Sequence, residues 1–377
     1  MKILIGISYY FPNISGVTIY AKRLAEGLVK RGHEVTVLTS RYDQSLPQKE
    51  IINGVLVFRS KVLLKIGKGI LMPLLPLQIF KLVKGCEIIN CHLPQFESFV
   101  FAIIGKLIGK RVILTHHTDL SGWPGFFNRI AEGSVWGGQL IAGMLADKIV
   151  PYTKDYADHS WYLRLFRRKL TYILPPIIAG RPDKNLAKKW QKELNNPQYI
   201  IGFAGRIARQ KGIPYLLRAI PFLEKEFASF KIVFAGPYKK VIGENYFLEI
   251  ENLVNKYKER LFFLGDISEE KMATFYSICD VLVLPSDDRL ESFGLVQAES
   301  MLQGCPVVAT DLPGARMPIK LTGMGLVVPA KNSQLLAEAI VKITKKRNFF
   351  VQTKNKAKKI FDCQKTIEEY ERLFNQS

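Results

Sequence analysis

The order of strands and helices in the C-terminal half constrains the fold most. The run Val-Leu-Val-Leu at residues 281–284 is short and wholly apolar, which is typical of a buried strand. A helix is expected to follow, beginning near Ser292, which can cap it, and ending at Gly304. Residues 307–309 give the next strand. Such a unit predicts two neighbouring strands of a parallel sheet, and ligands of such sheets bind in the loop after the first strand.

The same alternation of strand and helix patterns continues along most of the 377 residues. It predicts an α/β protein with parallel sheets and helices on both faces. A chain of this length is expected to form two domains, each large enough to bury its own core. A stretch rich in proline, glycine and charge begins at Leu174, and residues 181–197 within it are interpreted as a linker.

Two carboxylates frame the expected helix. If Glu291 and Glu299 both lie on it, roughly 12 Å along the axis separates them. Between them, the helix N-terminus at Gly294 offers free backbone N–H groups and a positive dipole end, which favour phosphate. A nucleotide-sugar, with a diphosphate in its middle and hydroxyls at both ends, fits this arrangement. The alternative is that both glutamates are solvated surface charges, because glutamate is mostly exposed in folded proteins.

Two cations follow another predicted strand, at residues 199–204. Arg206 and Lys211 lie in a loop flanked by glycines. Arginine can hold a diphosphate through bidentate hydrogen bonds, and lysine acts on it as a point charge. The alternative is again ordinary surface charge, because both residue types are mostly exposed.

The segment around the two glutamates resembles a known family. Glu-Ser-Phe-Gly-Leu at 291–295, Gln-Ala-Glu-Ser-Met at 297–301 and Gly-Cys-Pro-Val-Val-Ala-Thr at 304–310 resemble the Glu-x7-Glu region of the retaining glycosyltransferases of family 4, the glycosyl transferases of group 1. The resemblance implies the GT-B fold, with two Rossmann-like domains whose parallel sheets face each other across a cleft. It also implies a hexosyltransferase that uses a nucleotide diphosphate-sugar and retains the anomeric configuration.

The resemblance implies roles for the residues at matching positions. Glu291 is expected to contact the donor sugar and Glu299 the ribose, while Arg206 and Lys211 hold the diphosphate. The remaining donor-binding residues expected at the helix start are Phe293, Gly294 and Leu295.

Two loops of the first half are included through the same resemblance. The loop after the first strand often carries two glycines in the family, which approach the donor phosphate and the acceptor; here Gly16 is present and Ser15 occupies the other place. His117 follows a further strand where the family places a histidine near the donor sugar, and it is preferred over His116. The alternative is a structural histidine. The predicted catalytic residues are therefore Glu291, His117, Arg206 and Lys211.

The resemblance also gives the expected domains. Residues 1–180 form an acceptor-side Rossmann-like domain, and residues 198–361 form the domain that binds the nucleotide-sugar. The linker at 181–197 joins them. Residues 362–377 are expected to form a helix with one apolar stripe, which returns to pack on the first domain.

The charge and the cysteines restrict the partners and the compartment. A net charge of +21 implies anionic partners, namely a phosphorylated substrate, anionic lipid or nucleic acid. A basic nucleic-acid-binding protein is the alternative class, but no motif of that kind is present and no nucleic-acid partner is expected. Five cysteines without Cys-x-x-Cys spacing favour a reducing, cytoplasmic compartment. No cofactor or metal is expected, because the adjacent Asp287 and Asp288 suit a turn better than an ion.

Residues 61–84 combine many large apolar side chains with five lysines and no acid. The segment is too short and too interrupted by proline to span a bilayer, but it suits an interfacial position on anionic lipid. A second basic run, which extends the same face, contains Arg164, Arg167, Arg168 and Lys169. We therefore expect a peripheral protein at the inner face of the cell membrane, with a lipid, lipid-linked or polysaccharide-precursor acceptor. The alternatives are a soluble acceptor and a core helix pair whose lysines face water.

Overall fold

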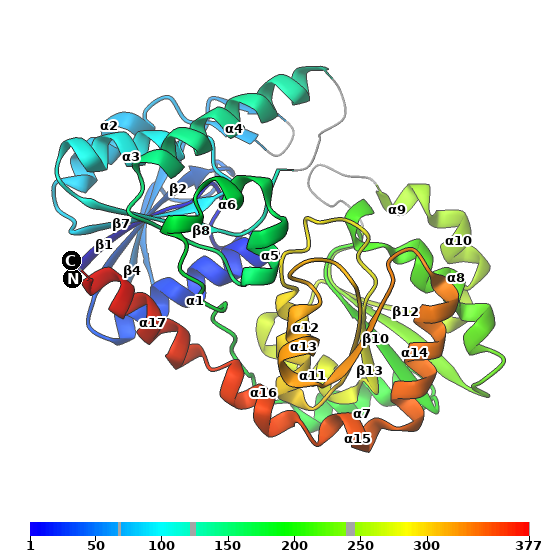
Figure 1. Ribbon diagram of the computed structural model, residues 1–377. Coiled ribbons are helices and arrows are strands. Elements are labelled where there is room, and N and C mark those ends of the chain that lie inside the picture. The colour runs from blue at the N-terminus through cyan, green and yellow to red at the C-terminus, as the bar shows by residue number, and fades with distance from the viewer. Residues whose placement is uncertain (67–68, 121–125, 239–245, 377) are drawn as a thin grey trace. The chain divides into compact units, whose positions relative to one another are not determined.

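A computed structural model describes residues 1–66, 69–120, 126–238 and 246–376 (Figure 1). The chain forms two compact units. Unit 1 consists of Met1–Pro176 together with Cys363–Ser377, and unit 2 consists of Ile177–Asp362. Each unit contains a mainly parallel sheet with helices around it, which confirms the predicted fold class.

The sheet of unit 1 has seven strands in the order β3-β4-β2-β1-β7-β8-β9. The strands are β1 Lys2–Gly6, β2 Glu34–Arg41, β3 Lys49–Ile52, β4 Val55–Lys61, β7 Ile88–Leu93, β8 Arg111–His116 and β9 Lys148–Val150. Neighbouring strands are parallel, except that β3 pairs antiparallel with β4. Asn53 and Gly54 connect this hairpin with positive φ angles of 49° and 84°, the backbone that a two-residue hairpin loop requires.

Helices cover both faces of this sheet. They are α1 Gly16–Lys30, α2 Leu75–Val83, α3 Ser98–Leu107, α4 Phe126–Leu145, α5 Lys154–His159, α6 Trp161–Leu165 and α17 Cys363–Asn375. A small antiparallel hairpin, β5 Leu64–Ile66 with β6 Gly69–Leu71, precedes α2. The helix α4 was not expected from the sequence, because it contains several glycines, which are poor helix formers. Two of them allow close packing: a Cβ at Gly138 would lie 2.7 Å from the Phe96 carbonyl oxygen, and one at Gly143 would lie 2.5 Å from the Phe166 ring.

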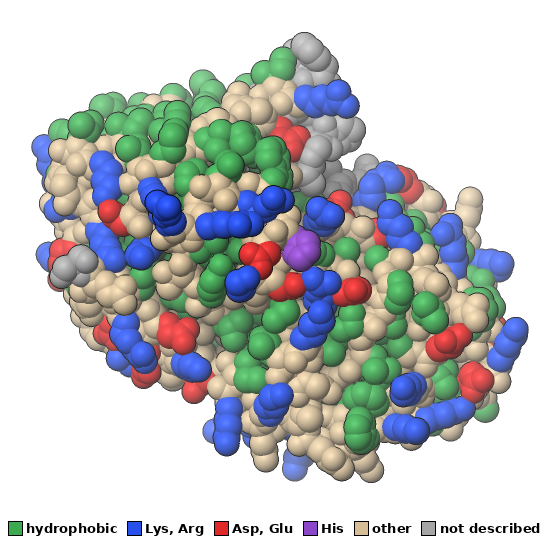
Figure 2. All heavy atoms as spheres, viewed as in Figure 1, with side chains coloured by type: hydrophobic (Ala, Val, Ile, Leu, Met, Phe, Trp, Pro, Cys, Tyr) green, Lys and Arg blue, Asp and Glu red, His purple; other side chains and the backbone are tan. Residues whose placement is uncertain are grey.

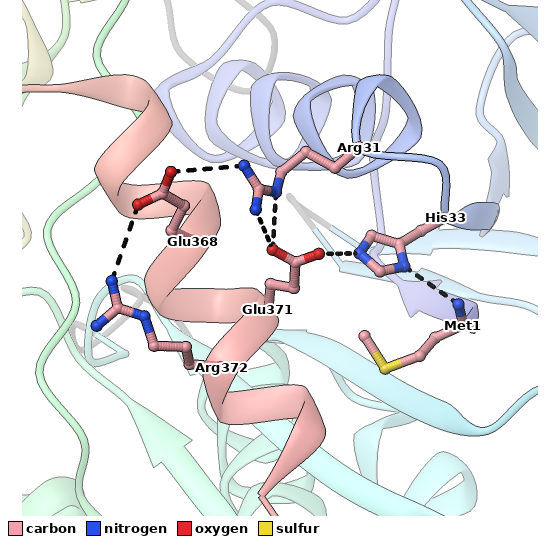
Figure 3. A network of polar contacts seen from close by, with 6 residues as sticks. All are labelled: Met1, Arg31, His33, Glu368, Glu371 and Arg372. Carbon is pink, nitrogen blue, oxygen red and sulfur yellow. Dashed lines mark hydrogen bonds and ion pairs between the residues drawn. The ribbon is translucent and has the colours of Figure 1, made fainter.

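The C-terminal helix α17 belongs to unit 1 and packs against α1. Its buried stripe contains Ile367, Tyr370, Leu373 and Phe374. On its exposed side, Glu371 accepts hydrogen bonds from Arg31 at 2.7 and 2.6 Å and lies 2.9 Å from His33 (Figure 3). Apolar burial therefore fixes the helix, and these polar contacts join it to the end of α1.

The sheet of unit 2 has six parallel strands in the order β12-β11-β10-β13-β14-β15. They are β10 Tyr199–Ala204, β11 Phe230–Ala235, β12 Leu261–Gly265, β13 Val281–Leu284, β14 Val307–Thr310 and β15 Gly325–Val328. The main helices are α7 Lys184–Glu193, α8 Ile213–Leu223, α9 Tyr246–Glu249, α10 Glu251–Lys256, α11 Glu269–Ile278, α12 Leu295–Gln303, α13 Met317–Thr322, α14 Ser333–Lys345, α15 Arg347–Val351 and α16 Lys354–Ile360. The central strands β13 and β14 are wholly buried and, except for Thr310, apolar, because both faces of the sheet are covered.

Residues 181–197, predicted to be a linker, instead contain the helix α7 and lie inside unit 2. The Asp183 carboxylate caps the helix by accepting hydrogen bonds from two backbone N–H groups, at 2.8 and 3.1 Å. Trp190 is buried, and α7 packs against α11. The chain leaves unit 1 after Pro176, several residues before the expected linker.

Both sheets contain a point at which the strand order reverses. In unit 2 the chain proceeds outward from β10 through β11 to β12, and on the other side from β13 through β14 to β15. In unit 1 the reversal lies between β1 and β7. The carboxyl ends of the strands at such a switch point are where open α/β sheets bind ligands.

Candidate functional site

At the switch point of unit 2, the loop after β10 meets the loop after β13. Gly212 has φ 62°, and a Cβ on it would lie only 1.9 Å from the Pro285 carbonyl oxygen. The backbone N–H of Asp287 donates to the Gln210 carbonyl at 3.3 Å. Any side chain at position 212 would force the two loops apart, so glycine is required for their close approach.

An ion pair joins the two loops. Lys211 Nζ lies 2.5 Å from the Glu291 carboxylate, and the two side chains are 18% and 12% exposed. The Ser286 hydroxyl donates a further, longer hydrogen bond to the same carboxylate oxygen, at 3.4 Å. Lys211 and Glu291 are 80 residues apart in the sequence, and both were predicted to bind the donor. The structure brings their side chains into contact. Because neither side chain is fully buried, both remain in reach of a bound ligand.

The helix α12 begins beside this ion pair, but later than expected. Its first residue is Leu295, and its N-cap is Gly294, with φ 75° and no side-chain cap. The predicted cap at Ser292 is wrong, and Glu291 lies in the loop before the helix rather than on it. A Cβ at Gly294 would lie 2.7 Å from both Gln297 Nε2 and the Leu284 side chain, so the chain turns into the helix against its own core. The first N–H groups of the helix have no intrahelical acceptor, which suits them for an anion.

Glu299 lies on α12, about one turn after the first helical residue, Leu295. Its carboxylate accepts a hydrogen bond from the Tyr276 hydroxyl at 2.8 Å. Tyr276 comes from α11 and is itself buried. The phenol holds the Glu299 side chain in one orientation at the surface of unit 2.

The other predicted donor-binding residues differ in what they can offer. The Arg206 side chain is half-buried at the end of β10, and its guanidinium has no ion pair or hydrogen bond with any residue in the described part of the chain. Phe293 is buried in the core against Phe361, so only its backbone is available to a ligand. Leu295 is partly exposed in the first turn of α12.

Gln297 was missed in the sequence, although it lies between the two glutamates. Its side-chain amide is buried and donates to the carbonyls of Phe293 at 2.9 Å and Ala315 at 2.7 Å. It therefore fixes the start of α12 to the loop after β14. The signal for it in the sequence is a polar residue on the same helix face as the buried Met301.

The remaining two predicted residues lie in unit 1. Gly16 is the exposed first residue of α1, after the Ser15 N-cap. His117 follows β8 and is buried, with Nε2 2.8 Å from His92 Nδ1 and Nδ1 bonded to the Tyr152 hydroxyl. Burial lowers the pKa of His117 well below its usual value, which keeps the ring neutral. In this conformation both ring nitrogens are occupied, so its predicted contact with the sugar would require one of these bonds to break.

Among the residues that the structure describes, no group of three or more His, Cys, Asp or Glu side chains is arranged to hold a metal ion. The Asp288 carboxylate accepts from the backbone N–H of Leu290 at 3.0 Å, which is a turn-forming bond. The candidate site in unit 2 thus consists of cations, two carboxylates and a helix start at the switch point of a parallel sheet. These features define the class of α/β proteins that bind nucleotides or other phosphorylated ligands.

Comparison with known proteins identifies the family. The model of the glycosyl transferases group 1 matches residues 185–360, and the model of glycosyltransferase family 4 matches residues 14–179. The chain belongs to this family of glycosyltransferases, enzymes that transfer hexosyl groups from nucleotide sugars. Its two parallel-sheet units are those of the GT-B fold, as the resemblance implied.

Individual relatives are similar over nearly the whole chain. An uncharacterized glycosyltransferase of Methanocaldococcus jannaschii is 28% identical, with 95% of this chain and 93% of the relative covered. A GDP-mannose-dependent alpha-mannosyltransferase of Mycolicibacterium smegmatis is 23% identical, with coverage of 90% and 89%. The solved structure of Anabaena HepE in complex with UDP-glucose superposes with a TM-score of 0.77 at 17% identity, with both chains fully covered.

Proposed function

We propose that the protein is a retaining glycosyltransferase that takes its sugar from a nucleotide diphosphate-sugar bound in unit 2. The observation that carries this proposal is the junction of Lys211, Glu291 and the uncapped start of α12 at the switch point. The similar proteins that are named for GDP-mannose or solved with UDP-glucose support a donor of this class.

The chemistry of the site follows from where charge develops. When the bond between the sugar C1 and the phosphate oxygen breaks, the sugar becomes oxocarbenium-like and the diphosphate gains negative charge. Lys211, Arg206 and the free N–H groups at the start of α12 are placed to stabilise that charge. Glu291 holds the Lys211 ammonium in place and offers its other oxygen to sugar hydroxyls.

Retention is proposed to occur by displacement on one face of the sugar. The acceptor hydroxyl oxygen bonds to C1 as the phosphate leaves, and its proton passes to the departing phosphate oxygen. A covalent route would need a carboxylate as nucleophile. The Glu291 oxygen Oε2 is already engaged by Lys211 and Ser286, which weakens it for that role.

The reaction can be tested directly. A thermal-shift screen of nucleotide-sugars identifies the donor, and proton NMR of the sugar released or transferred gives its anomeric configuration. We expect the product to keep the configuration of the donor. An inverted product would reject the retaining mechanism, and a protein that neither hydrolyses nor transfers any donor would reject the proposal for unit 2.

We further propose that unit 1 lies on an anionic membrane and receives a lipid, lipid-linked or polysaccharide-precursor acceptor there, at the inner face of the cell membrane. No helix in the described part of the chain is both long and apolar enough to cross a bilayer. The support comes from the apolar surface, defined as the exposed side chains of Leu63, Leu64, Leu71, Leu74, Leu77 and Phe80. In α2 the opposite face is also apolar and buried, so the exposed leucines are not needed for packing.

Figure 2 shows hydrophobic side chains gathered over α2, α3 and α4, with a row of Lys and Arg side chains beside them. An apolar face with a basic rim is typical of a protein that lies in a membrane interface. In the second basic run, Arg164, Arg167 and Arg168 are exposed. Lys169 is not part of the rim, because its ammonium donates to the Gly143, Met144 and Ala146 carbonyls at the end of α4. Lys68 and the side chain of Lys65, also expected in the rim, lie outside the described residues.

Flotation with vesicles tests the membrane proposal. We expect the wild-type protein to float with anionic vesicles at low salt and to dissociate as salt rises. The triple change Leu63→Ser, Leu77→Ser and Phe80→Ser should abolish flotation while donor hydrolysis continues. A matched control changes three exposed apolar residues of unit 2, Leu248→Ser, Leu335→Ser and Phe349→Ser. A wild-type protein that ignores anionic vesicles even at low salt would favour a soluble acceptor.

A further inference from the structure

A cavity of about 430 Å³ lies in unit 1, between the edge hairpin of the sheet and the start of α2. Three of its lining residues are basic, Lys49, Arg59 and Lys61, and none is acidic. Gln78 and the apolar Phe58 and Leu74 also line it. None of these residues was assigned a role in donor binding or catalysis.

Arg59 is a fixed cation in the wall of this cavity. Its side chain is fully buried, and its terminal nitrogens bond to the Glu50 carboxylate, the Pro47 carbonyl at 3.2 Å and the Phe11 carbonyl at 2.9 Å. Its Nε has no hydrogen-bond partner among the described residues, although it is buried. A buried donor of this kind normally has a partner. The unpaired Nε of Arg59, a residue that lines the cavity, therefore indicates a place for an acceptor atom of a ligand.

The other polar groups that line the cavity are Gln78 and two lysines. The carbonyl oxygen of the Gln78 side chain is buried and also has no described partner, and as an acceptor it suits a donor group of a ligand, such as a hydroxyl, rather than an ionised phosphate oxygen. Lys49 and Lys61 are exposed, and the Lys49 ammonium lies 5.2 Å from the centre of the Phe58 ring. Because the Arg59 charge is already paired with Glu50, the two exposed ammonium groups supply the net positive charge and the Arg59 Nε supplies a fixed donor. Together they form a suitable set for a phosphate.

The cavity is continuous with the apolar surface through Leu74. This side chain lines the cavity and is 49% exposed as part of that surface. Gln78, one turn later on α2, faces the cavity, while Leu77 beside it is exposed. A ligand that reached from the cations to these leucines would carry phosphate at one end and an apolar chain at the other.

We propose that this cavity binds the phosphate or diphosphate of a lipid-linked molecule, with Arg59, Lys49 and Lys61 around the phosphate and the apolar chain over Leu74. Within the proposed function, this molecule is the acceptor. Only the statement that the bound molecule is the acceptor rests on the proposed function. The binding itself does not, because the cavity and its charges belong to unit 1 alone.

The test uses soluble probes and needs neither membrane nor donor. Geranyl phosphate, geraniol and inorganic phosphate are titrated by calorimetry into the full-length protein. We expect geranyl phosphate to bind most tightly. The double change Lys49→Gln and Lys61→Gln should weaken its binding about tenfold or more, because each removes a hydrogen bond to a charged group. Both lysines are exposed, so the variant is expected to fold.

A control variant makes the same change in charge outside the cavity. Lys81→Gln with Lys84→Gln removes two cations of α2 that do not line it, and should change the affinity for geranyl phosphate by less than about twofold. Lysine labelling read by mass spectrometry should show geranyl phosphate protecting Lys49 and Lys61 but not Lys81 or Lys84.

Three results would overturn the proposal. Equal loss of affinity in both double variants would mean that only general charge attracts the probe. If geraniol binds as tightly as geranyl phosphate, the cavity does not recognise the phosphate. If inorganic phosphate binds as tightly as geranyl phosphate, the cavity does not recognise the apolar chain. Failure of vesicle flotation would reject the membrane proposal but leave these soluble titrations valid, so the two failures are distinguishable.

Discussion

The switch points of the two sheets have the same topology but opposite chemistry. In unit 2 the carboxyl ends of β10 and β13 carry the partly exposed charges of Arg206, Lys211 and Glu291. In unit 1 the segment after β7 carries Gln95 and Glu97, both almost wholly buried. The Glu97 oxygens make no hydrogen bond of normal geometry to any residue that the structure describes.

Burial explains why the unit 1 groups cannot serve an anion. It raises the pKa of Glu97 to about 7 and lowers the pKa of His92 to about 3. Both shifts favour the neutral form, because desolvation penalises charge. A site that binds a diphosphate needs cations that a ligand can reach, and in unit 2 Lys211 forms an ion pair with Glu291 while both side chains keep some contact with water. The difference teaches that side-chain environment, rather than strand order, distinguishes the two switch points as candidate sites for an anion.

The largest expected effect is on turnover. Lys211→Ala or Arg206→Ala should lower the rate of donor turnover by about 10²–10³, since each removes a stabiliser of the charge that develops on the leaving group. Steady-state kinetics at saturating donor measures it, with thermal unfolding to show that stability changes less.

Arg209→Ala is the matched control for this prediction. Arg209 lies in the same loop but points to Glu249, with its side chain 70% exposed. Near-normal turnover in the Lys211 and Arg206 variants, or an equal loss in the Arg209 variant, would show that the cations of this loop are not specific to the reaction.

The next effect is on stability, and it tests whether Glu97 at the switch point of unit 1 is buried in its neutral form. Because the folded pKa of Glu97 is raised above its ordinary value of 4.5, the folded protein holds a proton that the unfolded chain releases between pH 4.5 and about 7. The free energy of unfolding should therefore fall as pH rises through this window, by at most about 3 kcal/mol. Glu97→Gln should remove that fall and be more stable than wild type at pH 8, as measured by urea unfolding at several pH values.

Glu34→Gln, which changes an exposed glutamate of the same unit, serves as the control for Glu97. If the Glu97 variant keeps the pH dependence of the wild type, the carboxyl is not buried in its neutral form and the contrast between the two switch points fails.

A smaller effect is expected from the far end of the donor site. Glu299→Ala should weaken nucleoside diphosphate binding about 10- to 150-fold, through the loss of a hydrogen bond from the ribose to a charged group. Calorimetry reads the affinity. Tyr276→Phe removes only the hydroxyl group that orients Glu299, and it should weaken nucleoside diphosphate binding less than Glu299→Ala does. Unchanged affinity in a folded Glu299 variant would show that the ribose lies elsewhere.

The smallest expected effect concerns the C-terminal helix. The hydrogen bond from Arg31 lowers the pKa of Glu371 below its ordinary value of 4.5. Its contribution to stability is therefore fully present above pH 4.5 and is lost as pH falls through the lowered pKa. Glu371→Gln should cost little stability, because the contact is exposed, and its difference from wild type should shrink in acid. Thermal unfolding at neutral and acidic pH checks both points, and a difference that grew in acid would contradict the sign.

Much of the fold was predictable because its strands are short apolar runs. The strands β10 and β13 match the residues expected from the sequence, since burial on both faces leaves a clear pattern. The helix α7 was mistaken for a linker because Leu186 and Trp190 are its only large apolar side chains before Leu194. That stripe is narrow, and lysines cover the rest of the helix.

The site was predictable where chemistry depends on residue type and spacing, and not where it depends on tertiary contacts. The sequence placed Lys211 and Glu291 together, but it could not show that Gly294 rather than Ser292 begins α12, since that depends on Gln297 and the core beneath. It also could not reveal that His117 is bonded to His92, because the two residues come from different strand ends.

The central claim is that the donor diphosphate binds at the switch point of unit 2. It is tested most directly by titrating UDP, GDP and ADP into wild type, into the double variant Arg206→Ala with Lys211→Ala, and into Arg209→Ala. We predict that wild type binds at least one of these nucleotides, that the double variant binds it at least about 100-fold more weakly, and that the control binds it nearly as well. Wild-type affinity in the folded double variant would contradict the claim.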